Sequence, residues 1–154
     1  MTRSILVICI GNVCRSPMAA GLLSRHMPAC EVTSAGLAPP VGAPADPSAV
    51  KLLAREGLDI GSHRARAVDG ALVAAADLIL VMDSEQREEI ERAFPIARGK
   101  THRICESTST DVPDPYGCSP TMFYIVLELI KQGIASWSAR LGEVAPTKGR
   151  GEAS

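Results

Sequence analysis

The 154-residue sequence lacks the features that would point to nucleic acid or to a membrane. Its formal net charge is −1, so there is no excess of basic residues to attract a polyanion. No apolar run approaches the roughly 20 residues of a membrane span, and the first residues enter a strand pattern without a signal peptide. We therefore expect a cytoplasmic protein that binds no nucleic acid and inserts into no membrane.

Cysteine pairs and aromatic side chains are also scarce. The cysteines are odd in number and include no CxxC pair, which argues against a disulfide framework and a zinc site; they are Cys9, Cys14, Cys30, Cys105 and Cys118. We expect reduced thiols and no bound metal, and the pattern allows for one reactive thiol. With one tryptophan, two tyrosines and two phenylalanines, the chain has few candidates for an aromatic pocket rim, and Tyr116 is the clearest.

Apolar runs of strand length recur along the chain. The runs at 5–8 and 78–82 are continuous and contain β-branched residues, which is typical of strands buried on both faces of a parallel sheet. Weaker strands are expected at 31–34 and around 101–105.

Helix patterns with recognisable ends alternate with these strands. A long last helix is expected from the apolar stripe that Met122, Val126, Leu129, Ile130, Ile134 and Trp137 form. The expected ends of the earlier helices are Ser16-Pro17 for the start of the first, Asp46-Pro47 and Gly57 for the second, and Ser84 and Phe94-Pro95 for the third.

The alternation of strands and helices predicts the fold class. It favours an α/β fold in which a single domain, residues 1–141, holds an open parallel four-stranded sheet with helices on both faces. The final stretch APTKGRGEAS is small, polar and contains glycine, so we expect residues 142–154 to form a loose tail. In such sheets ligands bind beyond the carboxyl ends of the strands, and the first strand ends at Cys9.

The loop after the first strand has the composition of a phosphate-binding loop. Gly11 and Asn12 tolerate unusual backbone dihedrals, and a helix start with free N–H groups follows them. Arg15 adds a planar guanidinium that can grip two phosphate oxygens and that favours a thiolate at Cys9. Ser16 can cap the helix or donate its hydroxyl to the thiolate.

The features of this stretch indicate a function more strongly together than each does alone. A cysteine at the end of a strand is usually a core residue, and an arginine near a helix start is usually solvated. Packing alone does not explain a strand, a C-x5-R spacing, a Gly-Asn turn and a Ser-Pro helix start together. We therefore interpret residues 9–17, CIGNVCRSP, as a catalytic loop.

This stretch resembles the active-site signature of the low-molecular-weight protein tyrosine phosphatases, which lies close to the amino terminus. The resemblance continues to about Leu141, through TSAGL at 33–37, GAPADP at 42–47, GSHRAR at 61–66, ADLILVMD at 76–83 and DPYG at 114–117. The scarcity of aromatic residues at the rim resembles the bacterial branch associated with exopolysaccharide export. Members of that branch act with tyrosine autokinases, so the resemblance implies a phosphotyrosine protein of this kind as the partner.

The resemblance also implies roles for individual residues. Cys9 would be the nucleophile, Arg15 would bind the phosphate and Asp114 would be the general acid, with no metal or cofactor. Asn12, Ser34 and His63 match positions that brace the loop through hydrogen bonds. The residues that would contact the substrate are Ile10, Gly11, Asn12, Val13, Cys14 and Ser16 in the loop and Tyr116 at the rim.

Two other functions remain as alternatives. An arsenate reductase shares the fold and the thiolate–arginine loop, but it needs additional cysteines as a redox relay, and no cysteine occurs between residues 31 and 104. A non-catalytic phosphotyrosine-binding module would need Arg15 and the loop but neither a thiol nor an acid. The presence of both Cys9 and Asp114 argues against it.

Overall fold

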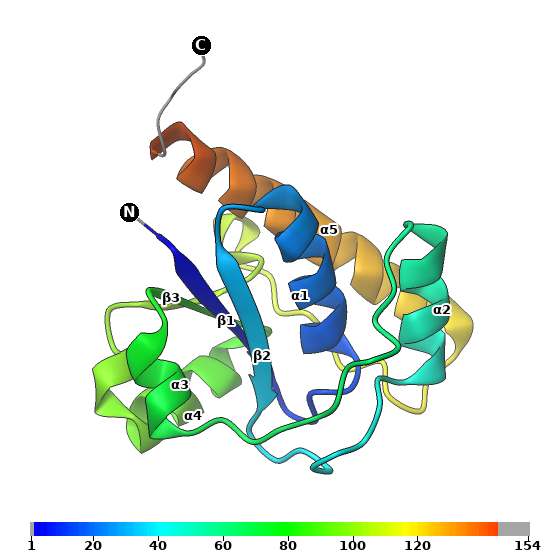
Figure 1. Ribbon diagram of the computed structural model, residues 1–154, viewed down its shortest axis with the longest axis horizontal. Helices are drawn as coiled ribbons and strands as arrows, with labels where there is room; N and C mark the ends of the chain where they lie inside the picture. Colours follow the sequence, from blue (N-terminus) through cyan, green and yellow to red (C-terminus); the bar gives the residue numbers. More distant parts are fainter. Residues whose placement is uncertain (1, 145–154) are drawn as a thin grey trace.

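A parallel four-stranded sheet forms the centre of the protein in the computed structural model, which describes residues 2–144 (Figure 1). Its strands are β1 (Ser4–Cys9), β2 (Glu31–Gly36), β3 (Leu78–Val81) and β4 (Thr101–Arg103). They lie in the order β2-β1-β3-β4, and every neighbouring pair is parallel. The expected open parallel sheet is confirmed.

The central strand β1 is buried on both faces, which explains its continuous apolar sequence. Ile5 and Val7 pack into one hydrophobic layer, and Leu6 and Ile8 pack into the other. Each of these side chains is at most 1% exposed. Burying an aliphatic side chain of this size stabilises the fold by about 1.5–3 kcal/mol. The two layers therefore hold β1 firmly and fix the position of its last residue, Cys9.

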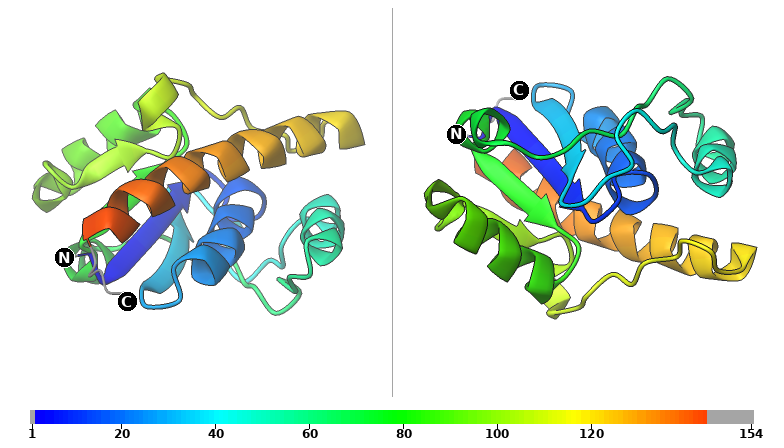
Figure 2. Two further views of the ribbon diagram at one scale, coloured as in Figure 1. Left: turned by 90° about the horizontal axis from the view of Figure 1, so that it is seen from above. Right: turned by 90° about the horizontal axis from the view of Figure 1, so that it is seen from below.

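Helices cover both faces of the sheet, as the sequence predicts. The layer of Ile5 and Val7 lies under α1 (Arg15–His26), α2 (Pro47–Arg55) and α5 (Pro120–Val144). The layer of Leu6 and Ile8 lies under α3 (Gly70–Ala75) and α4 (Ser84–Ala93). Figure 2 shows α1 and α5 side by side on one face, with α3 and α4 on the opposite face. Two 3₁₀ turns, 95–97 and 106–108, flank β4.

Several helix ends differ from the expected ones. The cap of α4 is Asp83, whose carboxylate accepts a hydrogen bond from the backbone N–H of Gln86 at 2.8 Å, so Ser84 is the first helical residue and not the cap. Helix α3, which has 6 residues and is capped by Asp69, was not predicted from the sequence. Such a helix is too short to show a periodic apolar stripe.

The last helix extends further than expected. Its buried stripe includes Val126, Ile130, Ile134 and Trp137, as predicted. However, α5 continues to Val144, so residues 142–144 of the expected loose tail are helical. The remainder of that tail lies outside the described residues. Among residues 2–144, no helix is both long enough and apolar enough to cross a membrane.

The strand order creates a crevice at the carboxyl end of β1. The first crossover leads from β1 to β2, and the next leads back across β1 to β3. The connections that follow β1 and β3 therefore run in opposite directions, which leaves room for a ligand between them. The loop of residues 10–14 lies at this point.

Candidate active site

The sulfur of Cys9 lies at the base of this crevice and receives two polar contacts. The backbone N–H of Asn12 donates to Sγ at 3.2 Å, and Oγ of Ser16 lies 3.0 Å from Sγ. The same Oγ accepts a hydrogen bond from Nδ2 of Asn12 at 2.8 Å, which leaves the hydroxyl hydrogen free to point at the sulfur. Both groups can donate a hydrogen bond to the sulfur. Of the two roles expected for Ser16, only this contact is present, because no side chain caps α1.

Asn12 holds the loop in its curved shape. Its backbone is left-handed, with φ of 56°, a conformation that asparagine tolerates better than most residues. Its amide is fully buried, and besides Ser16 it donates to Oγ of Ser34 at 3.0 Å. Nε2 of His63 lies 2.6 Å from the backbone oxygen of Asn12. The three residues expected to brace the loop are therefore in mutual contact through Asn12.

Arg66, for which no role was predicted from the sequence, completes this network. Its backbone N–H donates to Oδ1 of Asn12 at 3.0 Å, and its Nε donates to the backbone oxygen of Ser34 at 3.0 Å. Every side-chain hydrogen-bonding atom of the buried Asn12 amide is thus satisfied. Arg66 lies within the segment GSHRAR, but nothing in that pattern shows that a backbone N–H is the donor.

The loop packs tightly against the end of β2 at Gly36. A Cβ atom at this position would lie 2.7 Å from the backbone oxygen of Ile10 and 3.0 Å from Cβ of Asn12. The next two residues, Leu37 and Ala38, donate backbone hydrogen bonds to the oxygens of Cys9 and Ile10 at 3.0 and 2.9 Å. Glycine is therefore required at position 36 for this close approach.

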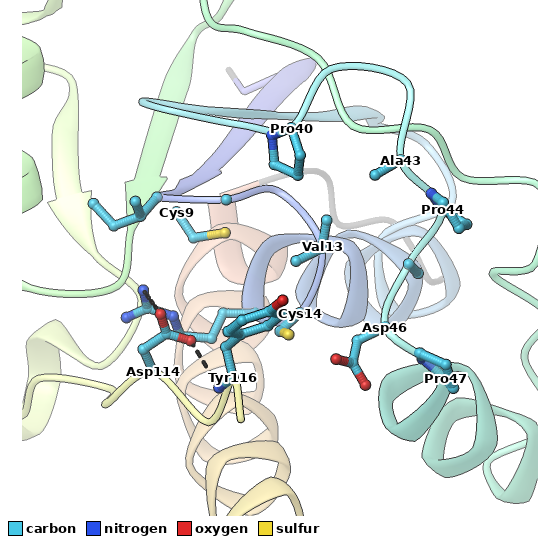
Figure 3. Close-up of a pocket in the computed structure, with 14 residues that line it drawn as sticks. Cys9, Val13, Cys14, Pro40, Ala43, Pro44, Asp46, Pro47, Asp114 and Tyr116 are labelled. Carbon is cyan, nitrogen blue, oxygen red and sulfur yellow. Dashed lines mark hydrogen bonds and ion pairs between the residues drawn. The ribbon is translucent and has the colours of Figure 1, made fainter. Parts of the chain in front are cut away.

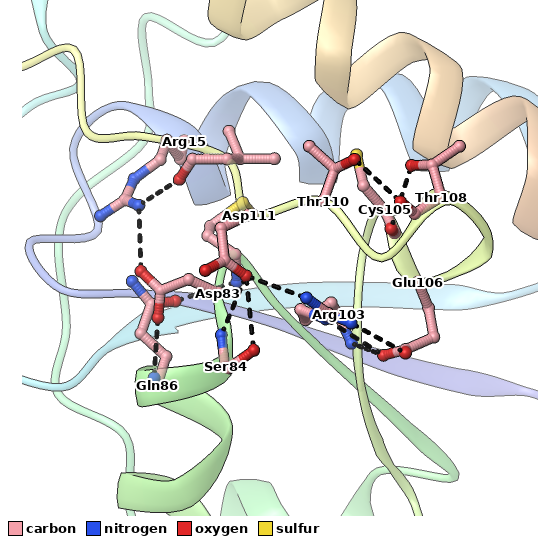
Figure 4. Close-up of polar contacts among 12 residues, drawn as sticks. Arg15, Asp83, Ser84, Gln86, Arg103, Cys105, Glu106, Thr108, Thr110 and Asp111 are labelled. Carbon is pink, nitrogen blue, oxygen red and sulfur yellow. Dashed lines mark hydrogen bonds and ion pairs between the residues drawn. The ribbon is translucent and has the colours of Figure 1, made fainter.

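Arg15 is a buried cation held between three oxygen groups, and Figure 4 shows the contact with one of them, the carboxylate of Asp83. Its side chain is only 3% exposed, and NH1 donates to the backbone oxygen of Val112 at 2.8 Å. NH1 also lies 3.9 Å from Oδ2 of Asp83 at the end of β3, and NH2 lies 3.8 Å from Oδ2 of Asp114. These groups offset the cost of burying the charge and hold the guanidinium in the cleft that Cys9 also lines. Neither Asp83 nor Val112 was predicted from the sequence as a partner of Arg15.

Asp114 and Tyr116 lie at the rim of the site. Asp114 is half exposed, and its Oδ1 accepts the backbone N–H of Tyr116 at 3.0 Å. This local turn places the carboxylate beside Arg15, and Tyr116 is 67% exposed. Figure 3 shows both side chains on one side of the cleft, across from Pro44, Asp46 and Pro47.

The cleft has a volume of about 600 Å³, which suits a phenyl phosphate group and its flanking peptide. Most of the residues expected in the site line it, namely Cys9, Ile10, Gly11, Val13, Cys14, Arg15, Asp114 and Tyr116. Asn12, Ser16, Ser34 and His63 lie behind the loop instead. Among residues 2–144, no group of three or more histidine, cysteine or acidic side chains could hold a metal ion.

Cys14 is a second buried thiol in the same cleft. Burial raises its pKa to about 12, with the negative charges of Asp46 and Asp114 as further contributors. Cys14 is therefore a neutral thiol at pH 7. It is not a competing nucleophile, but it lies in the same loop as Cys9.

We expect Cys14 to protect Cys9 from irreversible oxidation. Peroxide converts a thiolate to a sulfenic acid, which can condense with the second thiol to a disulfide and release water. Inactivation of the parent should be reversed by dithiothreitol, whereas inactivation of Cys14→Ala should be largely permanent. The attacking species is the Cys14 thiolate, so a pKa of about 12 makes the protection faster at higher pH. Equal recovery of both proteins would contradict this role.

Comparison with known proteins matches residues 4–146 to the family described as low molecular weight phosphotyrosine protein phosphatase. A probable low molecular weight protein-tyrosine-phosphatase, EpsP of Ralstonia nicotianae, is 47% identical over 92% of this chain and 97% of its own. Wzb of Escherichia coli, also a low molecular weight protein-tyrosine-phosphatase, is 37% identical over 92% of this chain and 97% of its own.

Solved structures agree in fold. The tyrosine phosphatase Wzb from Escherichia coli, in complex with sulphate, has a TM-score of 0.88 and 39% identity and covers 92% of this chain and 99% of that one. The YwlE arginine phosphatase of Geobacillus stearothermophilus has a TM-score of 0.86 and 30% identity. It covers 92% of this chain and 94% of its own.

A parallel α/β sheet with a cysteine–arginine loop at the carboxyl end of its first strand is typical of cysteine-dependent phosphatases, and the relatives named above place the chain in that class. Within that class, this chain belongs to the low molecular weight phosphotyrosine protein phosphatase family. The resemblance found in the sequence is therefore confirmed. The family match also continues beyond Leu141, the expected end of the domain.

Proposed function

We propose that the protein hydrolyses phosphotyrosine through a cysteinyl-phosphate intermediate. The position of the Cys9 sulfur at the base of the cleft is the observation that most supports this activity. Two hydrogen-bonding groups contact the sulfur, and Arg15 and Asp114 line the same cleft. The Cys9 thiolate attacks phosphorus, and the bond to the phenol oxygen breaks. Arg15 and the loop N–H groups stabilise the charge on the remaining phosphate oxygens.

The carboxyl group of Asp114 completes both halves of the reaction. In the first step it donates its proton to the departing phenol oxygen. In the second step the carboxylate accepts a proton from water, which attacks phosphorus and releases Cys9 and inorganic phosphate. The half-exposed position of Asp114 at the rim supports this role, because the leaving group and the incoming water both approach from the open side.

The depth and rim of the cleft favour phosphotyrosine over phosphoserine. Cys9 is only 2% exposed, whereas Tyr116 at the rim is 67% exposed, so the reactive sulfur lies well below the surface. A phosphorylated phenol reaches further than a phosphorylated serine. A phenolate is also a better leaving group than an alkoxide, since the pKa of tyrosine is about 10.

We further propose a cytoplasmic role in which the substrate is the tyrosine-rich tail of a bacterial tyrosine autokinase linked to exopolysaccharide production. The similarity to EpsP and Wzb supports this assignment. Prolines and small residues, including Pro40, Ala43 and Pro44, form most of the wall opposite Tyr116, and the charged Asp46 lies in the same wall (Figure 3). Such a wall offers few specific contacts, so we expect weak dependence on the residues that flank the phosphotyrosine.

Turnover assays separate this function from its alternatives. The purified protein should hydrolyse p-nitrophenyl phosphate without added metal and without thioredoxin. An arsenate reductase would instead consume arsenate in the presence of a thiol reductant, and a binding module would bind phosphotyrosine without turnover. Absence of phosphate release would refute the proposed function.

Peptide assays then test the substrate. Peptides of one sequence that carry phosphotyrosine, phosphoserine or phosphoarginine should be compared, the last because structural relatives include an arginine phosphatase. We expect the phosphotyrosine peptide to be preferred by at least about 100-fold in kcat/KM, which corresponds to about 2.7 kcal/mol. Comparable serine turnover would contradict the argument from the depth of the cleft, and comparable arginine turnover would contradict the proposed specificity for phosphotyrosine. The phosphorylated kinase tail from the same organism should also be a substrate, and an untouched tail would remove only that partner.

A further inference from the structure

A second hollow, of about 470 Å³, lies beside the candidate active site between α2 and the start of α5. The two hollows are lined by neighbouring parts of the same two segments of the chain. Asp46 and Pro47 line the cleft of Cys9, and the next residue, Ser48, lines the second hollow. On the opposite side Tyr116 lines the first hollow and Pro120 lines the second. Figure 2 shows α2 and the yellow start of α5 at the same end of the molecule.

The second hollow carries positive charge. Lys51 and Arg55 lie one turn apart on α2, and both line the hollow with exposed side chains. Within residues 2–144, neither forms an ion pair, and no carboxylate lines the hollow. Pro120 and Thr121, the first residues of the 25-residue α5, also line it and add the positive end of a helix dipole. These features together favour an anion.

The lining is also suited to an aromatic ring. Leu52 and Phe123 are buried and form an apolar base, and Tyr124 is 55% exposed at the edge. An exposed aromatic side chain can stack on a ring that enters the hollow. A simple carboxylate side chain would use the cations but not the apolar base. A phenyl phosphate would use both.

We propose that this hollow binds a second phosphotyrosine of the same substrate chain while the first lies above Cys9. This inference rests on the proposed function, since it assumes that a phosphotyrosine polypeptide lies in the adjacent cleft. The subsite selects segments that carry two phosphotyrosines over segments that carry one. Lys51 and Arg55 bind the second phosphate, and they contact no reacting atom.

The effect should appear in KM and not in kcat. Exposed ion pairs are individually weak, so two of them should lower KM for a doubly phosphorylated peptide by about five-fold beyond the two-fold statistical advantage. The advantage should shrink as ionic strength rises, because exposed charges are screened. A peptide series with different spacings between the two phosphotyrosines should show a preferred spacing.

The test compares the parent with the double variant Lys51→Gln/Arg55→Gln. The variant should lose the preference for the doubly phosphorylated peptide and keep the parent's kcat and KM for the singly phosphorylated peptide and for p-nitrophenyl phosphate. Arg92→Gln, which removes an exposed cation from α4 on the opposite face of the sheet, is the matched control and should keep the preference.

Three results would overturn the proposal. They are a parent without preference for the doubly phosphorylated peptide, a double variant that retains the preference, and an equal gain when glutamate replaces the second phosphotyrosine. The singly phosphorylated peptide reports separately on the proposed function. If the singly phosphorylated peptide is turned over normally and any of these three results is found, the proposed phosphatase activity stands and only the proposed second subsite is refuted.

Discussion

Replacing Cys9 with serine is expected to lower turnover by about a thousand-fold or more while the protein remains folded. The oxygen of serine is smaller than sulfur and can keep the contacts with the Asn12 N–H and with Ser16. A hydroxyl, however, has far too high a pKa to become a nucleophilic anion at neutral pH. Phosphate release from p-nitrophenyl phosphate measures the loss.

Binding provides the control for this variant. Arg15 and the loop N–H groups are unchanged in Cys9→Ser, so inorganic phosphate should still bind and raise the melting temperature. Loss of both binding and thermal stability would indicate a damaged loop and not a missing nucleophile. Activity above a few per cent of the parent's in a folded, phosphate-binding variant would show that Cys9 is not the nucleophile.

Replacing Asp114 with asparagine should lower turnover by roughly 10²–10⁴-fold on phosphotyrosine, the range typical of a general acid. Asparagine keeps the shape of the side chain, and its oxygen can still accept the Tyr116 N–H. It has no proton to give to the leaving oxygen. The loss should therefore be smaller for an aryl phosphate whose phenol is more acidic than tyrosine.

A series of aryl phosphates measures this dependence. In the parent, kcat/KM should vary little with the pKa of the phenol, because Asp114 protonates the oxygen. In Asp114→Asn it should fall steeply as that pKa rises. Equal losses across the series would point to a different acid. Asp111, an exposed carboxylate that contacts Arg103 and Ser84 and not Arg15, provides a matched control, since Asp111→Asn should retain activity.

Much of the fold was predictable because its signals are local. The continuous apolar run at residues 5–8 requires burial on both faces, and the alternation of strands and helices requires parallel pairing. The ends of the helices were harder to predict than the presence of the strands. Asp83 and Ser84 are both good caps, and only the backbone conformation of Asp83 selects it. The short α3 has no periodic pattern to detect.

The core of the site was also predictable, since Cys9, Asn12, Arg15 and Ser16 lie within one turn and helix start. Their spacing alone brings them together. The partners from distant segments were not predictable in the same way. The backbone N–H of Arg66 and the backbone oxygen of Val112 contact Asn12 and Arg15, but a backbone group leaves no trace in the residue type.

The sequence by itself determined the fold class, the family and the residues of the loop after β1, because each depends on the types and spacing of residues close in the chain. Only the tertiary structure decided which carboxylates face Arg15, which groups hold Asn12 in its left-handed conformation, and how high the pKa of Cys14 lies. It also decided that Lys51 and Arg55 lie beside Phe123 and Tyr124. These properties depend on distances and burial between segments that meet only when the sheet and its helices are packed.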